Sequence, residues 1–106
     1  MQNQFPTFDT EGFLQELELW TPVIAESIAY RENIFLTEQH WEIIYLVRNF
    51  YQQFEISPAM RPLVKYAGNN LGLDKGKSIY LMQLFPPSPA KLAAKIAGLP
   101  KPANCL

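Results

Sequence analysis

The sequence predicts a mainly α-helical domain of the α+β class, with a helix-turn-helix outline, a small N-terminal β-hairpin and a C-terminal arm. Three observations lead to this prediction. Apolar residues recur at helical spacing in five segments between residues 21 and 98, prolines and glycines mark the segment ends, and turn-forming residues near the start separate two short extended pieces. The chain has 106 residues, 48% of them hydrophobic, which is enough for one core, and no repeat or second domain is visible.

The expected hairpin comes first, over residues 5–17. Residues 9–12 supply turn chemistry, and Phe8 and Phe13 flank the turn. A hairpin of this size persists only when it packs on other elements. We therefore expect it to lie against the helices.

The first helix is expected to begin after Thr21, a typical N-cap residue, with Pro22 at the first helical position. The side chains expected to face inward are Val23, Ile24, Ile28 and, as a further candidate, Tyr30.

The second helix, expected within residues 36–57, has the strongest helical signal. Thr37 is the expected cap, and Glu38 adds a favourable charge to the first turn. Its surface is apolar on most sides, which predicts a central helix. We expect its aromatic residues to belong to the core and not to form a stacking platform for bases: Trp41, Tyr45, Phe50, Tyr51 and Phe54.

The third helix follows after a short connection, which produces the helix-turn-helix outline. Ser57 and Pro58 repeat the pattern of a cap followed by proline, and Gly72 is the expected stop. A short fourth helix is expected over residues 79–85, ended by two prolines. The last helix should begin at Ser88 and end at Gly98.

The tail carries the only cysteine of the chain, Cys105, at the second-to-last position. Pro100 and Pro102 favour a stiff, extended backbone. Seven residue steps separate Gly98 from Cys105, so at ~3.1 Å per residue the arm reaches roughly 20 Å. We therefore divide the chain into a helical domain, residues 1–98, and a mobile arm, residues 99–106. The residues alone leave two readings open, an incidental exposed thiol and a functional thiol that visits a partner.

Composition excludes several function classes. The formal net charge of −1 points neither to nucleic acid nor to an acidic membrane surface, and no apolar run approaches the ~20 residues of a membrane span. The N-terminus lacks the features of a secretory signal, and a single cysteine excludes an internal disulfide and a cysteine-rich zinc site. We expect a cytoplasmic protein without a metal or cofactor.

Basic residues form a second candidate site. Lys101 lies on the arm, and four more basic residues lie on or after the third helix: Arg61, Lys65, Lys75 and Lys77. They are either a solvated surface or a contact for an acidic partner or for tRNA phosphates. His40 has neither cysteine nor paired acids near it in sequence, so we expect a structural or surface role for it.

Several stretches of the chain resemble the DsrC/TusE family, whose members carry a penultimate cysteine after a GLPKP segment. The resemblance covers nearly the whole chain and is most specific at the tail; the matching stretches are DTEGFL, LTEQHWEII, ISPAMRPL and LFPPSPAKLAAKIAGLPKPANCL. It implies a mainly helical fold with a small N-terminal hairpin. It also implies that Cys105 carries sulfur as a persulfide, which needs no metal or cofactor.

The family divides on a second cysteine, eleven residues before the penultimate one in DsrC proteins, where this chain has Ala94. The single-cysteine pattern implies a sulfurtransferase that takes sulfur from a TusBCD-type complex. It would pass this sulfur to an MnmA-type tRNA thiouridylase for 2-thiolation of the wobble uridine, with any tRNA contact indirect. The alternatives are a DsrC-like regulator or partner of sulfite reductase, and a helix-turn-helix nucleic-acid binder, although the near-neutral charge argues against DNA.

Overall fold

The computed structural model describes residues 4–103 of the chain. Within this range the elements are a 3-10 turn at Leu17–Leu19 and the helices α1 (Pro22–Arg31), α2 (Glu38–Phe54), α3 (Met60–Leu71), α4 (Ser78–Leu84) and α5 (Pro89–Ile96). The mainly helical prediction is therefore confirmed. In residues 4–103, every helix is too short or too polar to cross a bilayer.

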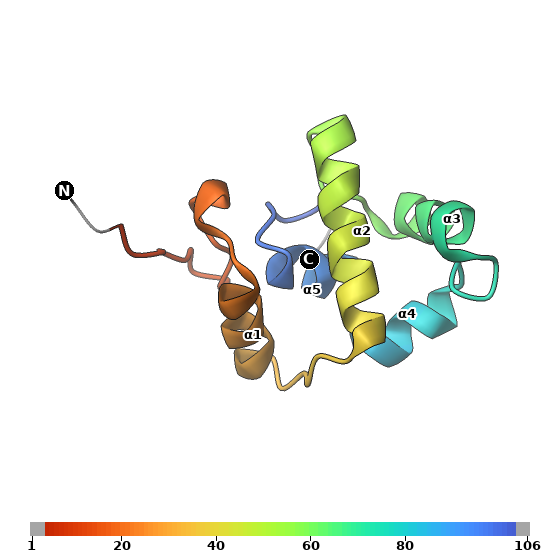
Figure 1. The fold of residues 1–106 in the computed structure, drawn as a ribbon, viewed down its shortest axis with the longest axis horizontal. Coiled ribbons are helices and arrows are strands. Elements are labelled where there is room, and N and C mark those ends of the chain that lie inside the picture. The colour runs from red at the N-terminus through yellow and green to blue at the C-terminus, as the bar shows by residue number, and fades with distance from the viewer. Residues whose placement is uncertain (1–3, 104–106) are drawn as a thin grey trace.

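Helix α5 occupies the centre of the fold, and the other four helices pack around it (Figure 1). Nearly all of its residues are buried, including Ala90, Ala93 and Ala94. These small side chains let the neighbouring helices approach closely, because no bulk separates the backbones. The prediction that the helix within residues 36–57 is the central one is wrong, because α2 leaves Tyr45 and Phe54 exposed.

The helix ends agree with local capping chemistry. The side chain of Thr21 accepts a hydrogen bond from the backbone of Ile24 at the start of α1. Gly72 and Gly98 follow α3 and α5 with positive φ angles of 115° and 74°. At the start of α2, the backbone N–H of Thr37 donates to Nδ1 of His40. His40 Nε2 donates to the carbonyl of Leu84, so this buried histidine joins α2 to α4.

The expected β-hairpin is wrong. Among residues 4–103, the only β pairing is one isolated antiparallel bridge between Phe8 and Leu14. Asp9 uses its side chain to accept hydrogen bonds from the backbone of Glu11 and Phe13, which closes a tight turn. The pairing does not lengthen, because the backbone N–H of Thr7 donates to the side chain of Glu16 and the 3-10 turn begins soon after the bridge.

Two of the side chains expected to face inward from α1 are exposed. Val23 is 76% exposed and Tyr30 is 82% exposed, whereas Ile28 is buried and Ile24 is half-buried. The helix instead places Ala25 and Ala29 against its neighbours. The two alanines were not among the residues expected to face inward. Close packing against the alanines of α5 nevertheless favours small side chains there.

Candidate functional site

The site is the base of the C-terminal arm, where α5 ends and the tail begins. The backbone N–H of Gly98 donates to the carbonyl of Lys95, and that of Leu99 donates to the carbonyl of Ala94. These two bonds form a Schellman motif, which requires a left-handed residue at Gly98. A Cβ at Gly98 would lie only 2.3 Å from Cδ1 of Trp20. Gly98 is therefore fixed both by its backbone angle and by a close packing contact.

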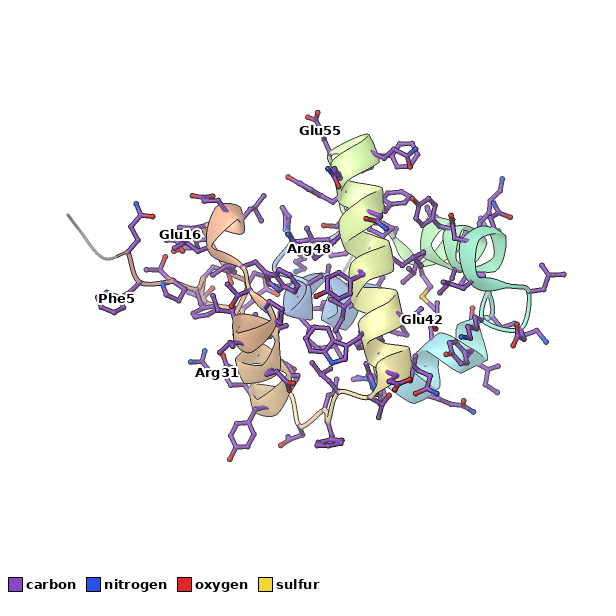
Figure 2. The ribbon with its side chains drawn as sticks, in the orientation of Figure 1. Phe5, Glu16, Arg31, Glu42, Arg48 and Glu55 are labelled. Carbon is purple, nitrogen blue, oxygen red and sulfur yellow. The ribbon has the colours of Figure 1, made fainter. Side chains whose placement is uncertain are left out.

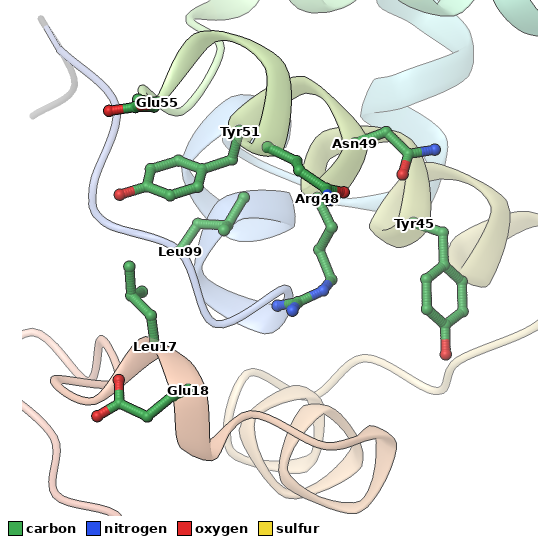
Figure 3. Close-up of a pocket in the computed structure, with 9 residues that line it drawn as sticks. Leu17, Glu18, Tyr45, Arg48, Asn49, Tyr51, Glu55 and Leu99 are labelled. Carbon is green, nitrogen blue, oxygen red and sulfur yellow. The ribbon is translucent and has the colours of Figure 1, made fainter.

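Two side chains from other elements cover the last carbonyls of α5. Trp20 Nε1 donates to the carbonyl of Ile96 at 2.9 Å, and Nη1 of Arg48 donates to the carbonyl of Ala97 at 2.6 Å. Figure 3 shows Arg48 reaching from α2 down to the turn that follows α5. The carbonyls that a helix end leaves without partners are thereby satisfied.

Arg48 is held in an unusual environment for a cation. Its guanidinium lies 3.9 Å from the centre of the Trp20 ring, and burial lowers the pKa of its guanidinium from the ordinary value. Within residues 4–103 no carboxylate forms an ion pair with it. It remains protonated because an arginine pKa is so high. Its charge therefore lies at the negative end of the α5 dipole, next to the start of the arm.

The arm continues along the body after α5. Leu99 is only 3% exposed, the hydroxyl of Ser57 donates to the carbonyl of Pro100, and Pro102 is buried. Lys101 pairs with Glu11 in the N-terminal turn at 3.1 Å. The contacts between the chain and the body therefore continue past Gly98 and extend to Pro102.

Glu11 connects the arm to the helical body. It lies 3.1 Å from Lys101 and 3.3 Å from Lys91 of α5. The hydrogen bonds from Lys101 and then Lys91 hold the pKa of the Glu11 carboxyl below its usual value. The turn that was expected to form a hairpin therefore serves as an anchor for the arm.

Two cavities flank this part of the arm. One, of about 580 Å³, lies between the 3-10 turn, α2 and Leu99; the residues that line it are Leu17, Glu18, Tyr45, Arg48, Asn49, Tyr51, Gln52, Glu55 and Leu99 (Figure 3). The other, of about 270 Å³, lies beside residues 100–103 and is lined by Tyr51, Glu55, Ile56, Ser57, Pro100, Lys101 and Ala103. Tyr51 and Glu55 border both cavities. The arm therefore leaves the body between two hollows of its surface.

The predicted site residues do not all come together. Cys105 lies outside the described residues, whereas Gly98, Pro100, Pro102 and Lys101 gather at the base of the arm. Ala94, at the position of the second cysteine of DsrC proteins, is fully buried in α5.

The remaining basic candidates lie on α3 and in the loop after it. Lys75 is paired with Glu42 at 2.7 Å, while Arg61, Lys65 and Lys77 are exposed. Figure 2 places Glu42 on the side of α2 toward these elements and Arg48 on the side toward α1. The cations on α3 and after it therefore do not gather with Lys101 at the arm.

Sequence reasoning missed Trp20, Arg48, Ser57 and Glu11 as parts of this site. Arg48 did carry a signal, since it is the single arginine or lysine in helix α2. Ser57 was expected to cap α3, but the cap is Ala59, and the hydroxyl of Ser57 binds the arm instead.

Comparisons with known proteins found similar sequences that cover nearly the whole chain. The model of the family described as DsrC like protein matches residues 1–106. The Sulfurtransferase TusE homolog of Haemophilus influenzae is 54% identical over 98 residues, which cover 92% of this chain and 90% of that protein. Sulfurtransferase TusE of Escherichia coli K12 is 52% identical over the same shares of both chains.

Solved structures resemble the fold as well. The solution structure of DsrC from Allochromatium vinosum is 47% identical, with a TM-score of 0.85 over 93% of this chain and 88% of that chain. The oxidized gamma-subunit of the dissimilatory sulfite reductase (DsrC) from Archaeoglobus fulgidus is 39% identical, with a TM-score of 0.82 over 95% of this chain and 92% of that chain.

Proposed function

The chain belongs to the family of DsrC-like proteins, and on this basis we propose that it is a sulfurtransferase that carries persulfide sulfur for tRNA thiolation. The observation that carries the proposal is its 52–54% identity to TusE sulfurtransferases over 92% of its length. The family model matches residues 1–106 and therefore includes the elements that build the base of the arm.

Cys105 is the sulfur-carrying residue in this proposal, because it is the only cysteine of the chain. Its thiolate attacks the outer sulfur of a persulfide on the donor protein. A new S–S bond forms to Cys105, the S–S bond of the donor breaks, and the donor cysteine leaves as a thiolate. The number of electrons and sulfur atoms is conserved, so the step needs no metal and no oxidant. The acceptor removes the sulfur by the same exchange.

The base of the arm supports this role by directing the tail away from the core. Gly98 turns the chain out of α5, and contacts at Leu99 and Pro102 then hold it along the body. Two prolines reduce the freedom of the backbone before docking, which lowers the entropy lost on binding. We propose that residues beyond this base move between partners, as expected for a carrier that must enter two active sites.

The partners that fit this role are a TusBCD-type donor complex and an MnmA-type tRNA thiouridylase, with sulfur delivered to the wobble uridine. Contact with tRNA would be indirect. Of the basic residues expected to bind phosphates, Lys75 and Lys101 are already paired with carboxylates. The reducing cytoplasm is the compartment in which such a free thiol persists.

A DsrC-like regulator or sulfite-reductase partner is the alternative, favoured by the similarity to solved DsrC structures. The absence of a second thiol argues against it, because Ala94 stands at that position and the chain has one cysteine. A disulfide cycle within the chain is therefore impossible.

The test uses a strain that lacks the protein and is complemented with the native chain or with Cys105→Ser. We expect the native chain to restore thiolated tRNA and the variant to restore none. Intact-mass measurement of the native chain after incubation with a cysteine desulfurase and its relay proteins should reveal one added sulfur atom. Full thiolation with Cys105→Ser would overturn the proposal.

A further inference from the structure

The contacts of the arm limit how far Cys105 can travel from the body. Pro102 is buried, and three residue steps separate it from Cys105. A fully extended chain of that length spans at most about 10 Å between Cα atoms. An arm free from Gly98 onward would reach about twice as far. A partner that takes the thiol into a pocket must therefore bring its surface against the body while Pro102 stays buried.

The body surface within this reach contains an exposed apolar residue. Ile56 is 63% exposed and lines the cavity beside Pro100, Lys101 and Ala103. A single exposed apolar residue is common on protein surfaces, so Ile56 gains its meaning from the cavity that it lines and from the charges beside it. We call the residues of this cavity the arm-exit surface: Tyr51, Glu55, Ile56, Ser57, Pro100, Lys101 and Ala103.

The charges around this surface indicate the chemistry of the partner. The two cations that line the flanking cavities are occupied, because Arg48 binds the carbonyl of Ala97 and Lys101 pairs with Glu11. Glu18 and Glu55 also line these cavities, are exposed, and form no ion pair with any residue in the range 4–103. The unpaired charge beside the arm is therefore negative.

This charge suits a protein that handles sulfur. A thiol that gives or accepts persulfide sulfur reacts as the thiolate, which positive surroundings stabilise. The entrance to such an active site is therefore expected to be electropositive. Acidic residues around the arm would attract it and orient it toward the tail. An apolar centre and a charged rim are also the usual arrangement of a protein–protein interface.

Building on the proposed function, we propose that the arm-exit surface, together with Glu18 of the adjoining cavity, is the docking site for the donor protein that passes persulfide sulfur to Cys105. That partner presents an apolar surface with lysine or arginine at its edge. The exposed cations on α3 and after it are not part of this contact.

The experiment compares two isoleucines of similar exposure. Ile56→Asp lies at the arm-exit surface, and Ile79→Asp is the control on α4, where the side chain is 69% exposed. Each variant replaces the native chain in a strain that lacks the protein. The readouts are thiolated tRNA and the fraction of Cys105 that carries an extra sulfur by intact mass. We expect Ile56→Asp to lose at least tenfold in both and Ile79→Asp to match the native chain.

Reaction with glutathione persulfide separates docking from chemistry, because this small donor needs no docking surface. We expect both variants to react with it at the native rate. A slower reaction of Ile56→Asp would mean that the substitution changes the thiol itself, and it would overturn the docking proposal.

Charge is tested with the double variant Glu18→Gln, Glu55→Gln in purified sulfur transfer from the donor relay. We expect a severalfold loss at low salt that disappears at high salt, since screening removes the attraction in the native chain too. A rate equal to that of the native chain at low salt would overturn the role of these acidic residues.

The two proposals fail in different ways. If Cys105→Ser abolishes thiolation but Ile56→Asp and Ile79→Asp behave alike, the docking site is wrong and the sulfur carrier stands. If Cys105→Ser restores thiolation, the carrier proposal fails regardless of the surface variants.

Discussion

Two helices of this chain end at a glycine, but the two ends lie in different surroundings. After α3, a Cβ at Gly72 would meet only the Asp74 carboxylate, at 3.0 Å. After α5, a Cβ at Gly98 would enter the Trp20 ring. A glycine therefore ends α3 at the surface, whereas the glycine that follows α5 packs against Trp20 at the base of the arm. The difference teaches that the glycine after α5 is required for packing as well as for its backbone angle, whereas the glycine after α3 is required for its backbone angle alone.

The largest expected effect comes from alanine at these two glycines. Gly72→Ala should cost only backbone strain, because φ 115° and ψ 153° lie in a region essentially reserved for glycine, and we expect about 1–3 kcal/mol. Gly98→Ala adds the clash with Trp20, for which overpacking costs about 1–3 kcal/mol more. Urea unfolding of both variants measures the free energy of unfolding. Equal losses for the two variants would mean that Trp20 moves aside at no cost and that the platform is not rigid.

The helix ends could be predicted from sequence because capping is local. Thr21 and Gly98 act on residues within one turn, so the neighbouring sequence contains the whole signal. The central place of α5 could not be read in the same way, because alanine side chains give little sign of burial in the sequence and the burial of this helix depends on four other helices.

The candidate site was predicted only in part for the same reason. Gly98, Pro100 and Pro102 lie in one short stretch of the sequence, but the groups that hold this stretch are distant from it in sequence. Arg48 is 49 residues from Ala97, and Ser57 is 43 residues from Pro100. Only the fold brings such pairs together. Ser57 also misled the prediction, because serine before proline looks the same whether it caps a helix or binds another segment.

The next largest effect is expected from removing the cation at the end of α5. Arg48→Met keeps an apolar stem but leaves the Ala97 carbonyl without its donor and removes the contact with Trp20. Loss of a hydrogen bond from a charged donor should lower the free energy of unfolding by about 2 kcal/mol.

The control for this variant is Lys75→Met on the other side of α2, which breaks the ion pair with Glu42 at the surface. Exposed pairs contribute little, so we expect its unfolding curve to overlay that of the native chain. If the Lys75 variant were as unstable as the Arg48 variant, the side of α2 that faces the arm would contribute no more to the free energy of unfolding than the other side.

A smaller effect is expected for two serines that share the same sequence pattern. Ser57→Ala removes the hydrogen bond to Pro100 and should cost about 1 kcal/mol. Ser88→Ala changes the residue before α5, whose side chain makes no capping hydrogen bond, and should leave stability unchanged. Amide hydrogen exchange should also quicken in the first variant alone at Leu99 and Lys101, since the prolines between and after them carry no amide hydrogen. Equal exchange in both variants would mean that Ser57 does not hold the arm.

The smallest effect concerns acid. The lysines beside Glu11 hold its pKa below the ordinary value for glutamate, about 4.3. A group with a lowered folded pKa stabilises the fold fully above the ordinary value, and this contribution disappears as the pH falls through the folded pKa. The tie between Glu11 and Lys101 should therefore hold at neutral pH and open only at a pH below the ordinary pKa of glutamate. Because Glu11 is exposed, the change should be visible in the NMR signals of Lys101 and not in the unfolding curve.

Glu11→Gln should give the acid spectrum of Lys101 already at pH 7, while the signals of α3 stay the same. If the Lys101 signals in this variant still moved with acid as in the native chain, another carboxylate would hold the arm, and the anchor assigned to the N-terminal turn would be wrong.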